Sequence, residues 1–183
     1  NIGKAQSIDT IIKAANICKE NKNIQWIILG DGSEKKYLDE KIIELGLYNI
    51  KALGRKPVEE MPKYFDRADA LLVTLTKDEL FKITVPAKVQ SYMAAGKPVI
   101  GCISGEGKEL IEEANCGFTC EAEDYKGLSE IALKIDEMNK SELNKYELNA
   151  LNYFNENFDR EIVLDNMEEI LIGKKGVLIE DVI

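Results

Sequence analysis

The sequence predicts an α/β protein: a Rossmann-like, doubly wound parallel sheet with helices on both faces and a C-terminal helical extension. Short apolar segments alternate with amphipathic helical patterns as far as Cys120, and the connections between them are short. Beyond Asp124 only helical spacing remains. Regular alternation of this kind is typical of parallel strands joined by helices, and continuous apolar strands indicate a sheet that is covered on both faces.

Each predicted element follows from its local spacing. Ile8, Ile11, Ile12 and Ala15 recur on one face of a helix from Ser7 to about Glu20, with Ser7 as the N-cap. The predicted strands are Ile24–Leu29, Ile50–Leu53, Ala70–Thr74, Pro98–Ile103 and Cys116–Cys120. Further helices are predicted at Glu34–Leu45, Val58–Arg67, Pro86–Ala95, Gly105–Ala114, Tyr125–Met138, Ser141–Asn155 and Asp159–Ile172. We expect residues 1–172 to form one domain and residues 173–183 to be a tail, either disordered or packed on another part of the protein.

Composition excludes several classes of function. The net charge of −9 argues against a nucleic-acid partner, which would require a basic face. No apolar stretch approaches the roughly 20 residues needed to span a bilayer. The four cysteines form no CxxC pair and the chain has no histidine, so we expect no zinc site. Cys18, Cys102, Cys116 and Cys120 are best explained as small buried residues in a reducing compartment.

Ligands of doubly wound sheets bind at the carboxyl ends of the strands, beside helix N-termini that attract anions. Gly30 and Gly32 leave room for a ligand beside the backbone, and Ser33 is placed to cap the next helix. Arg55, Lys56 and Pro57 follow the second strand and offer two cations. Gly105 and Gly107 expose amides to an anion, whereas Glu106 between them suits sugar hydroxyls. A tight turn with nothing bound explains the Gly30 loop about equally well, and plain surface charge does so for the Arg55 loop.

One longer pattern is more specific than these loops. Met93-Ala94-Ala95-Gly96-Lys97-Pro98-Val99-Ile100, preceded by Gly30-Asp31-Gly32 and Leu53-Gly54-Arg55, resembles the C-terminal domain of retaining GT-B glycosyltransferases of family 4, the group 1 type. The resemblance covers roughly residues 1 to 170, and Asn1 to Gln6 look like the start of that domain, just after its first strand has begun. It implies a nucleotide-sugar-binding domain whose N-terminal, acceptor-binding partner domain is missing from this sequence.

The resemblance also assigns residues. It places the donor's base near Arg55, Lys56 and Pro57, and its diphosphate near Gly3, Lys4 and the loop that leads into the Pro86 helix. Many relatives carry two glutamates with seven residues between them, but Ile83 and Ser91 stand at those positions here. We therefore expect Thr84, Lys88, Gln90, Ser91 and Glu106 to contact the donor instead. Lys4 and Lys88 are the candidates for stabilising the leaving nucleoside diphosphate.

The resemblance implies transfer of a sugar, with retention, from a nucleotide sugar, for which we favour a UDP sugar, to a polysaccharide or lipid-linked acceptor. No metal and no other cofactor are expected. The full-length enzyme would be cytoplasmic, with a peripheral place at the inner face of the plasma membrane as one option. Two alternatives stay open: a GT-B relative such as a nucleotide-sugar epimerase, which the lack of histidine weakens, and a catalytically silent nucleotide-binding module.

Overall fold

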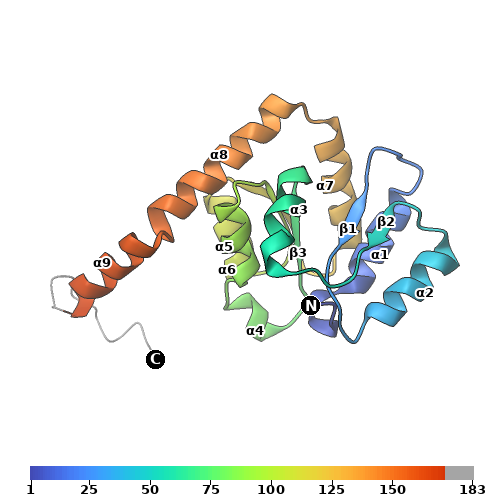
Figure 1. The fold of residues 1–183 in the computed structure, drawn as a ribbon, viewed down its shortest axis with the longest axis horizontal. Coiled ribbons are helices and arrows are strands. Elements are labelled where there is room, and N and C mark those ends of the chain that lie inside the picture. Colours follow the sequence, from blue (N-terminus) through green and yellow to red (C-terminus); the bar gives the residue numbers. More distant parts are fainter. Residues whose placement is uncertain (172–183) are drawn as a thin grey trace.

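The protein is an α/β domain with a helical arm (Figure 1). The computed structural model describes residues 1–171. Its strands are β1 (Trp26–Ile28), β2 (Ile50–Ala52), β3 (Leu71–Thr74), β4 (Val99–Cys102) and β5 (Gly117–Cys120). Its α-helices are α1 (Ile8–Ile17), α2 (Lys35–Leu45), α3 (Met61–Arg67), α4 (Glu79–Lys82), α5 (Ala87–Ala94), α6 (Glu106–Glu113), α7 (Tyr125–Glu137), α8 (Lys140–Asn157) and α9 (Arg160–Leu171), and 3₁₀ turns lie at Lys4–Gln6 and Val58–Glu60.

All strand pairs in the described chain are parallel, as predicted. β1 pairs with β2, and β3, β4 and β5 pair in that order, so the backbone hydrogen bonds form two parallel sheets rather than one continuous sheet. The registers place Trp26 beside Ile50 and Cys102 beside Cys120. Because all strands run the same way within each sheet, the loops that follow them gather at one edge.

Two apolar clusters form the core, and only the first of them reaches both sheets. One joins α1 and α7 to both sheets through buried side chains such as Ile12, Trp26, Ile100 and Leu128. The other lies among α5, α6 and α8 and includes Val73, Met93, Val99, Ile111 and Ala150. Cover on both faces explains the almost continuously apolar strands of the three-stranded sheet, the pattern that predicted the fold, whereas β1 and β2 each have an exposed middle residue, Ile27 and Lys51.

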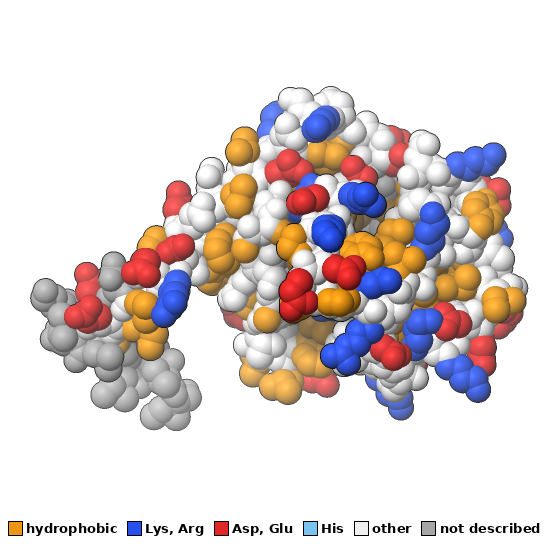
Figure 2. All heavy atoms as spheres, in the orientation of Figure 1, with side chains coloured by type: hydrophobic (Ala, Val, Ile, Leu, Met, Phe, Trp, Pro, Cys, Tyr) orange, Lys and Arg blue, Asp and Glu red, His pale blue; other side chains and the backbone are white. Residues whose placement is uncertain are grey.

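The last two helices form an arm: α8 packs on α5 along part of its length, and α9 extends beyond the α/β body (Figure 1). Asn139 begins α8 with a capping box, since its side chain accepts a hydrogen bond from Glu142 N and the Glu142 carboxylate accepts one from Asn139 N. Val163, Leu164, Met167 and Ile170 are partly exposed along α9, and Figure 2 shows hydrophobic side chains along this arm. The predicted helical extension is confirmed up to Leu171, and the predicted tail, residues 173–183, lies outside the described residues.

Several local predictions need correction. Ser33 does not cap α2, because the helix begins at Lys35 and Glu34 occupies the N-cap. Ser7 does occupy the N-cap of α1, but its backbone is left-handed and its hydroxyl pairs with the Thr10 hydroxyl at 2.8 Å instead of capping an amide. The short helix α4, whose N-cap Asp78 accepts from Leu80 N, interrupts a segment that was expected to be a loop.

The four cysteines are buried free thiols, as predicted. Desolvation raises the pKa of Cys116 to about 12, so this thiol is unreactive at neutral pH. Within residues 1–171, no helix combines the length and apolar character needed to cross a membrane.

Candidate functional site

The loops singled out in the sequence lie at the carboxyl ends of the strands, and backbone hydrogen bonds join the first of them. Gly30 N donates to Gly54 O at 2.9 Å, and Ile2 N donates to Asp31 O at 2.9 Å. Thr76 N, after β3, donates to Ala5 O at 3.0 Å. The segment from Asn1 to Gln6 therefore bridges the carboxyl ends of β1 and β3, which brings the first loops of the predicted site together.

Packing within the protein requires glycine at positions 32 and 105, and this requirement could not be seen in the sequence. At φ +154°, a Cβ on Gly32 would lie 2.4 Å from Ile2 O, and at φ +76°, one on Gly105 would lie 2.0 Å from Lys82 O. At Gly107 the neighbour is Pro86, 2.7 Å away at Cδ. The close approach at these glycines is made by the protein's own backbone and proline ring. Their predicted contact with a donor stays a prediction.

Four predicted cations stand at this edge. Lys4, Arg55 and Lys88 are exposed and Lys56 is half-buried. Within residues 1–171, none of the four forms an ion pair. Protein atoms around the Lys88 ammonium partly desolvate it and lower its pKa. The side chain is nevertheless exposed, and contact with solvent keeps this lowering of the pKa small. All four side chains are thus available to an anionic group.

The helix α5 and the loop before it carry the other predicted contacts. Pro86 occupies the N-cap, so Lys88 lies in the first helical turn, beside free backbone amides. The Ser91 hydroxyl donates to Ala87 O at 3.0 Å and the Thr84 hydroxyl to Leu80 O at 3.2 Å. Gln90 is half-buried. Both hydroxyls keep acceptor capacity, but their protons are directed to the protein backbone.

An open hollow of about 530 Å³ lies at the carboxyl ends of β3, β4 and β5. It is lined by Lys77, Asp78, Glu79, Lys82, Ser104 and Glu121. Glu106, predicted to bind sugar hydroxyls, is exposed at the start of α6 and does not line it. Two ammonium and three carboxylate groups line this space, and Lys108, which pairs with Glu121, supplies a third cation beside it. The volume is within the range of small-molecule sites.

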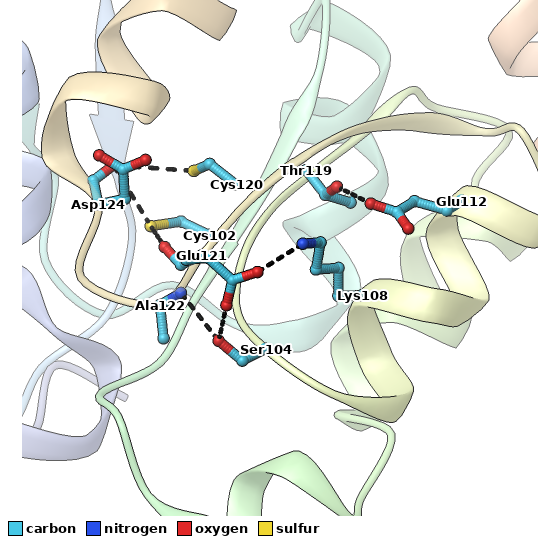
Figure 3. Close-up of polar contacts among 9 residues, drawn as sticks. All are labelled: Cys102, Ser104, Lys108, Glu112, Thr119, Cys120, Glu121, Ala122 and Asp124. Atoms are coloured by element: carbon cyan, nitrogen blue, oxygen red, sulfur yellow. Dashed lines mark hydrogen bonds and ion pairs between the residues drawn. The ribbon is translucent and has the colours of Figure 1, made fainter.

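Two side-chain hydrogen bonds hold the Glu121 carboxylate in this hollow (Figure 3). It follows β5 and receives hydrogen bonds from Lys108 Nζ at 2.5 Å and from Ser104 Oγ at 2.6 Å. The Ser104 Oγ in turn accepts from Ala122 N at 3.2 Å. The hydrogen bond from Lys108, followed by that from Ser104, lowers the pKa of the Glu121 carboxyl, which is therefore ionised at neutral pH.

Sequence reasoning missed Glu121 and Ser104. The position of Glu121 directly after the predicted strand Cys116–Cys120 was a usable signal, because the carboxyl end of a parallel strand is where binding residues occur. The partnership with Lys108 joins residues from different elements, and no local spacing predicts it.

The family model for glycosyl transferases group 1 matches residues 1–152. The chain belongs to that family. A curated member, the amylovoran biosynthesis glycosyltransferase AmsK of Erwinia amylovora, is 29% identical over 135 residues, which cover 72% of this chain and 33% of AmsK.

Solved structures show the same fold for this group 1 glycosyl transferase chain. Anabaena HepE in complex with UDP superposes with a TM-score of 0.81 at 23% identity, over 94% of this chain and 47% of HepE. The C-terminal domain of the Francisella tularensis group 1 protein LpcC gives a TM-score of 0.69 at 18% identity, over 87% of this chain and 83% of that domain. The chain thus spans about a third of AmsK and about half of HepE. The predicted GT-B family and α/β fold are confirmed.

Proposed function

We propose that this chain binds the nucleotide-sugar donor, a UDP sugar, of a group 1 glycosyl transferase. The observation that carries the proposal is the edge at the carboxyl ends of the strands, where Lys4, Arg55, Lys56 and Lys88 have no ion-pair partner within residues 1–171. On a chain with a net charge of −9, cations at helix N-termini and strand ends are suited to a diphosphate. The presence of UDP in the HepE structure supports the choice of base.

Each group has a role in this proposal. Arg55, Lys56 and Pro57 contact the base and ribose, whereas Lys4 and Lys88 stabilise the negative charge that develops on the leaving diphosphate. The amides at the start of α5 add fixed dipoles beside Lys88. These groups need no proton transfer, so no histidine and no metal are required of this chain.

The complete reaction needs a second domain. We propose a two-domain protein in which the other domain binds the acceptor, a polysaccharide or a lipid-linked sugar, and the sugar is transferred with retention. The name of AmsK, an amylovoran biosynthesis enzyme, supports an acceptor of this class. A lipid-linked acceptor would bring the whole protein to the inner face of the plasma membrane.

A thermal-shift panel with UDP-, GDP-, ADP- and CMP-sugars tests the proposal. A ligand present at about 100 times its Kd stabilises the fold by about 2.7 kcal/mol. We expect a clear rise in Tm with a UDP sugar and a smaller rise for the variant Lys88→Met. Lys145→Met on α8, which removes an exposed lysine from the arm, is the matched control and should respond like the wild type. Absence of any shift across the panel would contradict donor binding by this chain.

A further inference from the structure

The hollow between the loops after β3, β4 and β5 holds a carboxylate that a diphosphate does not need. Phosphate oxygens are recognised by cations and amides, whereas a carboxylate repels them and accepts hydrogen bonds from hydroxyl groups. We propose that Glu121 contacts the sugar hydroxyls of the donor and determines which sugar is bound. This inference rests on the proposed function and adds to it a residue that determines sugar specificity.

The geometry leaves Glu121 free to accept further hydrogen bonds. An ionised carboxylate offers about four lone-pair sites. Ser104 uses one site on one oxygen and Lys108 uses one on the other. The side chain is 58% exposed, so its remaining lone pairs face solvent in the hollow. Its two tethers hold the carboxylate in one orientation, and this reduces the entropy lost when a ligand binds.

The other two carboxylates of the hollow are engaged differently. Asp78 accepts from Leu80 N at 2.8 Å and caps α4. Glu79 pairs with Lys82 of its own helix, α4, at 2.6 Å, and its side chain is 88% exposed. Glu121 is the carboxylate of this group that two side chains from other elements, the loop after β4 and α6, hold in place (Figure 3).

The hollow also adjoins the proposed diphosphate position. Lys77 follows Thr76, whose amide binds Ala5 O next to Lys4, and Lys77 N donates to the Glu123 carboxylate at 3.1 Å. On the other side, the Lys82 backbone packs on Gly105 at the start of α6. A donor whose diphosphate lies at Lys4 therefore has its sugar within reach of a space of about 530 Å³ that ends at Glu121.

The experiment compares a nucleoside diphosphate with its sugars. Titration calorimetry on the full chain measures the Kd of UDP, UDP-glucose, UDP-galactose and UDP-N-acetylglucosamine for wild type and Glu121→Gln. Because a hydrogen bond to a charged group contributes more than a neutral one, we expect the best-bound UDP sugar to lose about tenfold or more in affinity, while the affinity for UDP is unchanged. The preference among the three sugars should also become smaller.

Two further variants make the result specific. Glu112→Gln is the matched control, because Glu112 is a carboxylate of α6 that binds the Thr119 hydroxyl outside the hollow, and it should leave all four affinities unchanged. Ser104→Ala removes one tether of Glu121 and should produce the same selective loss at a smaller size. An equal change in the affinities for UDP and UDP sugars, or no change in either, would overturn the inference while leaving the proposed function intact. Failure of the wild type to bind any of the four would overturn both.

Discussion

The substitution Gly105→Ala tests whether the glycine loop before α6 serves packing inside the protein. Gly105 has φ +76° and ψ −149°, a backbone region that an alanine adopts at a cost of about 1–3 kcal/mol. The new Cβ would lie 2.0 Å from Lys82 O and 2.5 Å from Lys82 Cα, so backbone must move. Such overpacking adds about 1–3 kcal/mol. We expect a total loss of about 2–6 kcal/mol.

The variant Gly46→Ala separates the cost of the backbone conformation from the cost of the steric clash. Gly46 ends α2 with φ +62°, but nothing lies within 4 Å of the position that a methyl group would take there, so only the backbone cost of about 1–2 kcal/mol applies. Urea unfolding of both variants without nucleotide measures the difference. Each kcal/mol corresponds to about 2–4 °C in Tm for a domain of this size. An equal loss in the free energy of unfolding for the two variants would refute the packing role of Gly105 and would favour a ligand-binding role for this glycine.

Four other outcomes follow from the same contacts. Asn139→Ala removes the cap of α8 and should cost about 1 kcal/mol in urea unfolding, whereas Ser33→Ala, at the rejected cap, should cost nothing measurable. Glu121 has a lowered pKa in the folded protein, so its stabilising effect is present above the unfolded pKa of about 4.3 and is lost as the pH falls through the lower, folded pKa. Because the ion pair with Lys108 is partly exposed, the free energy of unfolding of the wild type should exceed that of Glu121→Gln by less than about 1 kcal/mol at pH 7, and this difference should shrink as the pH falls below about 4.3. The four buried thiols should react with a thiol reagent only as fast as the protein unfolds, and fast labelling of the native chain would contradict their burial. Lys108→Met should weaken binding of UDP sugars more than binding of UDP, and an equal loss for both would show that Lys108 does not act through Glu121.

The fold was predictable because its signals are local and periodic. Apolar strands covered on both faces, helices such as α1 and α7, and glycines at strand ends each appear within a few residues of sequence. The first and last residues of the helices were less predictable, because tertiary contacts determine where a helix begins and ends. Ser33 has the chemistry of an N-cap, yet the approach of Ile2 to Asp31 and Glu34 fixes the turn and moves the start of α2 to Lys35.

The site was predictable in outline only. The rule that parallel strands end at one edge located the loops at Gly30, Arg55 and Gly105, and backbone hydrogen bonds join the first loops as expected. The hollow was not predicted, since Lys77, Ser104 and Glu121 come from three separate loops. Contacts of this kind depend on the three-dimensional order of β3, β4 and β5, which no spacing in the sequence encodes.

Hydrogen exchange with and without a UDP sugar measures the central claim most directly. We predict that the bound ligand protects amides along one edge only: residues 3–7, 30–34, 54–57, 76–88, 104–108 and 121–124. The opposite ends of the strands, at Asn49, Lys97 and Cys116, supply an internal control that should not change. Protection of the loops at the carboxyl ends would support a donor site there, whereas protection confined to the opposite ends, or none at a saturating concentration of the ligand, would contradict it.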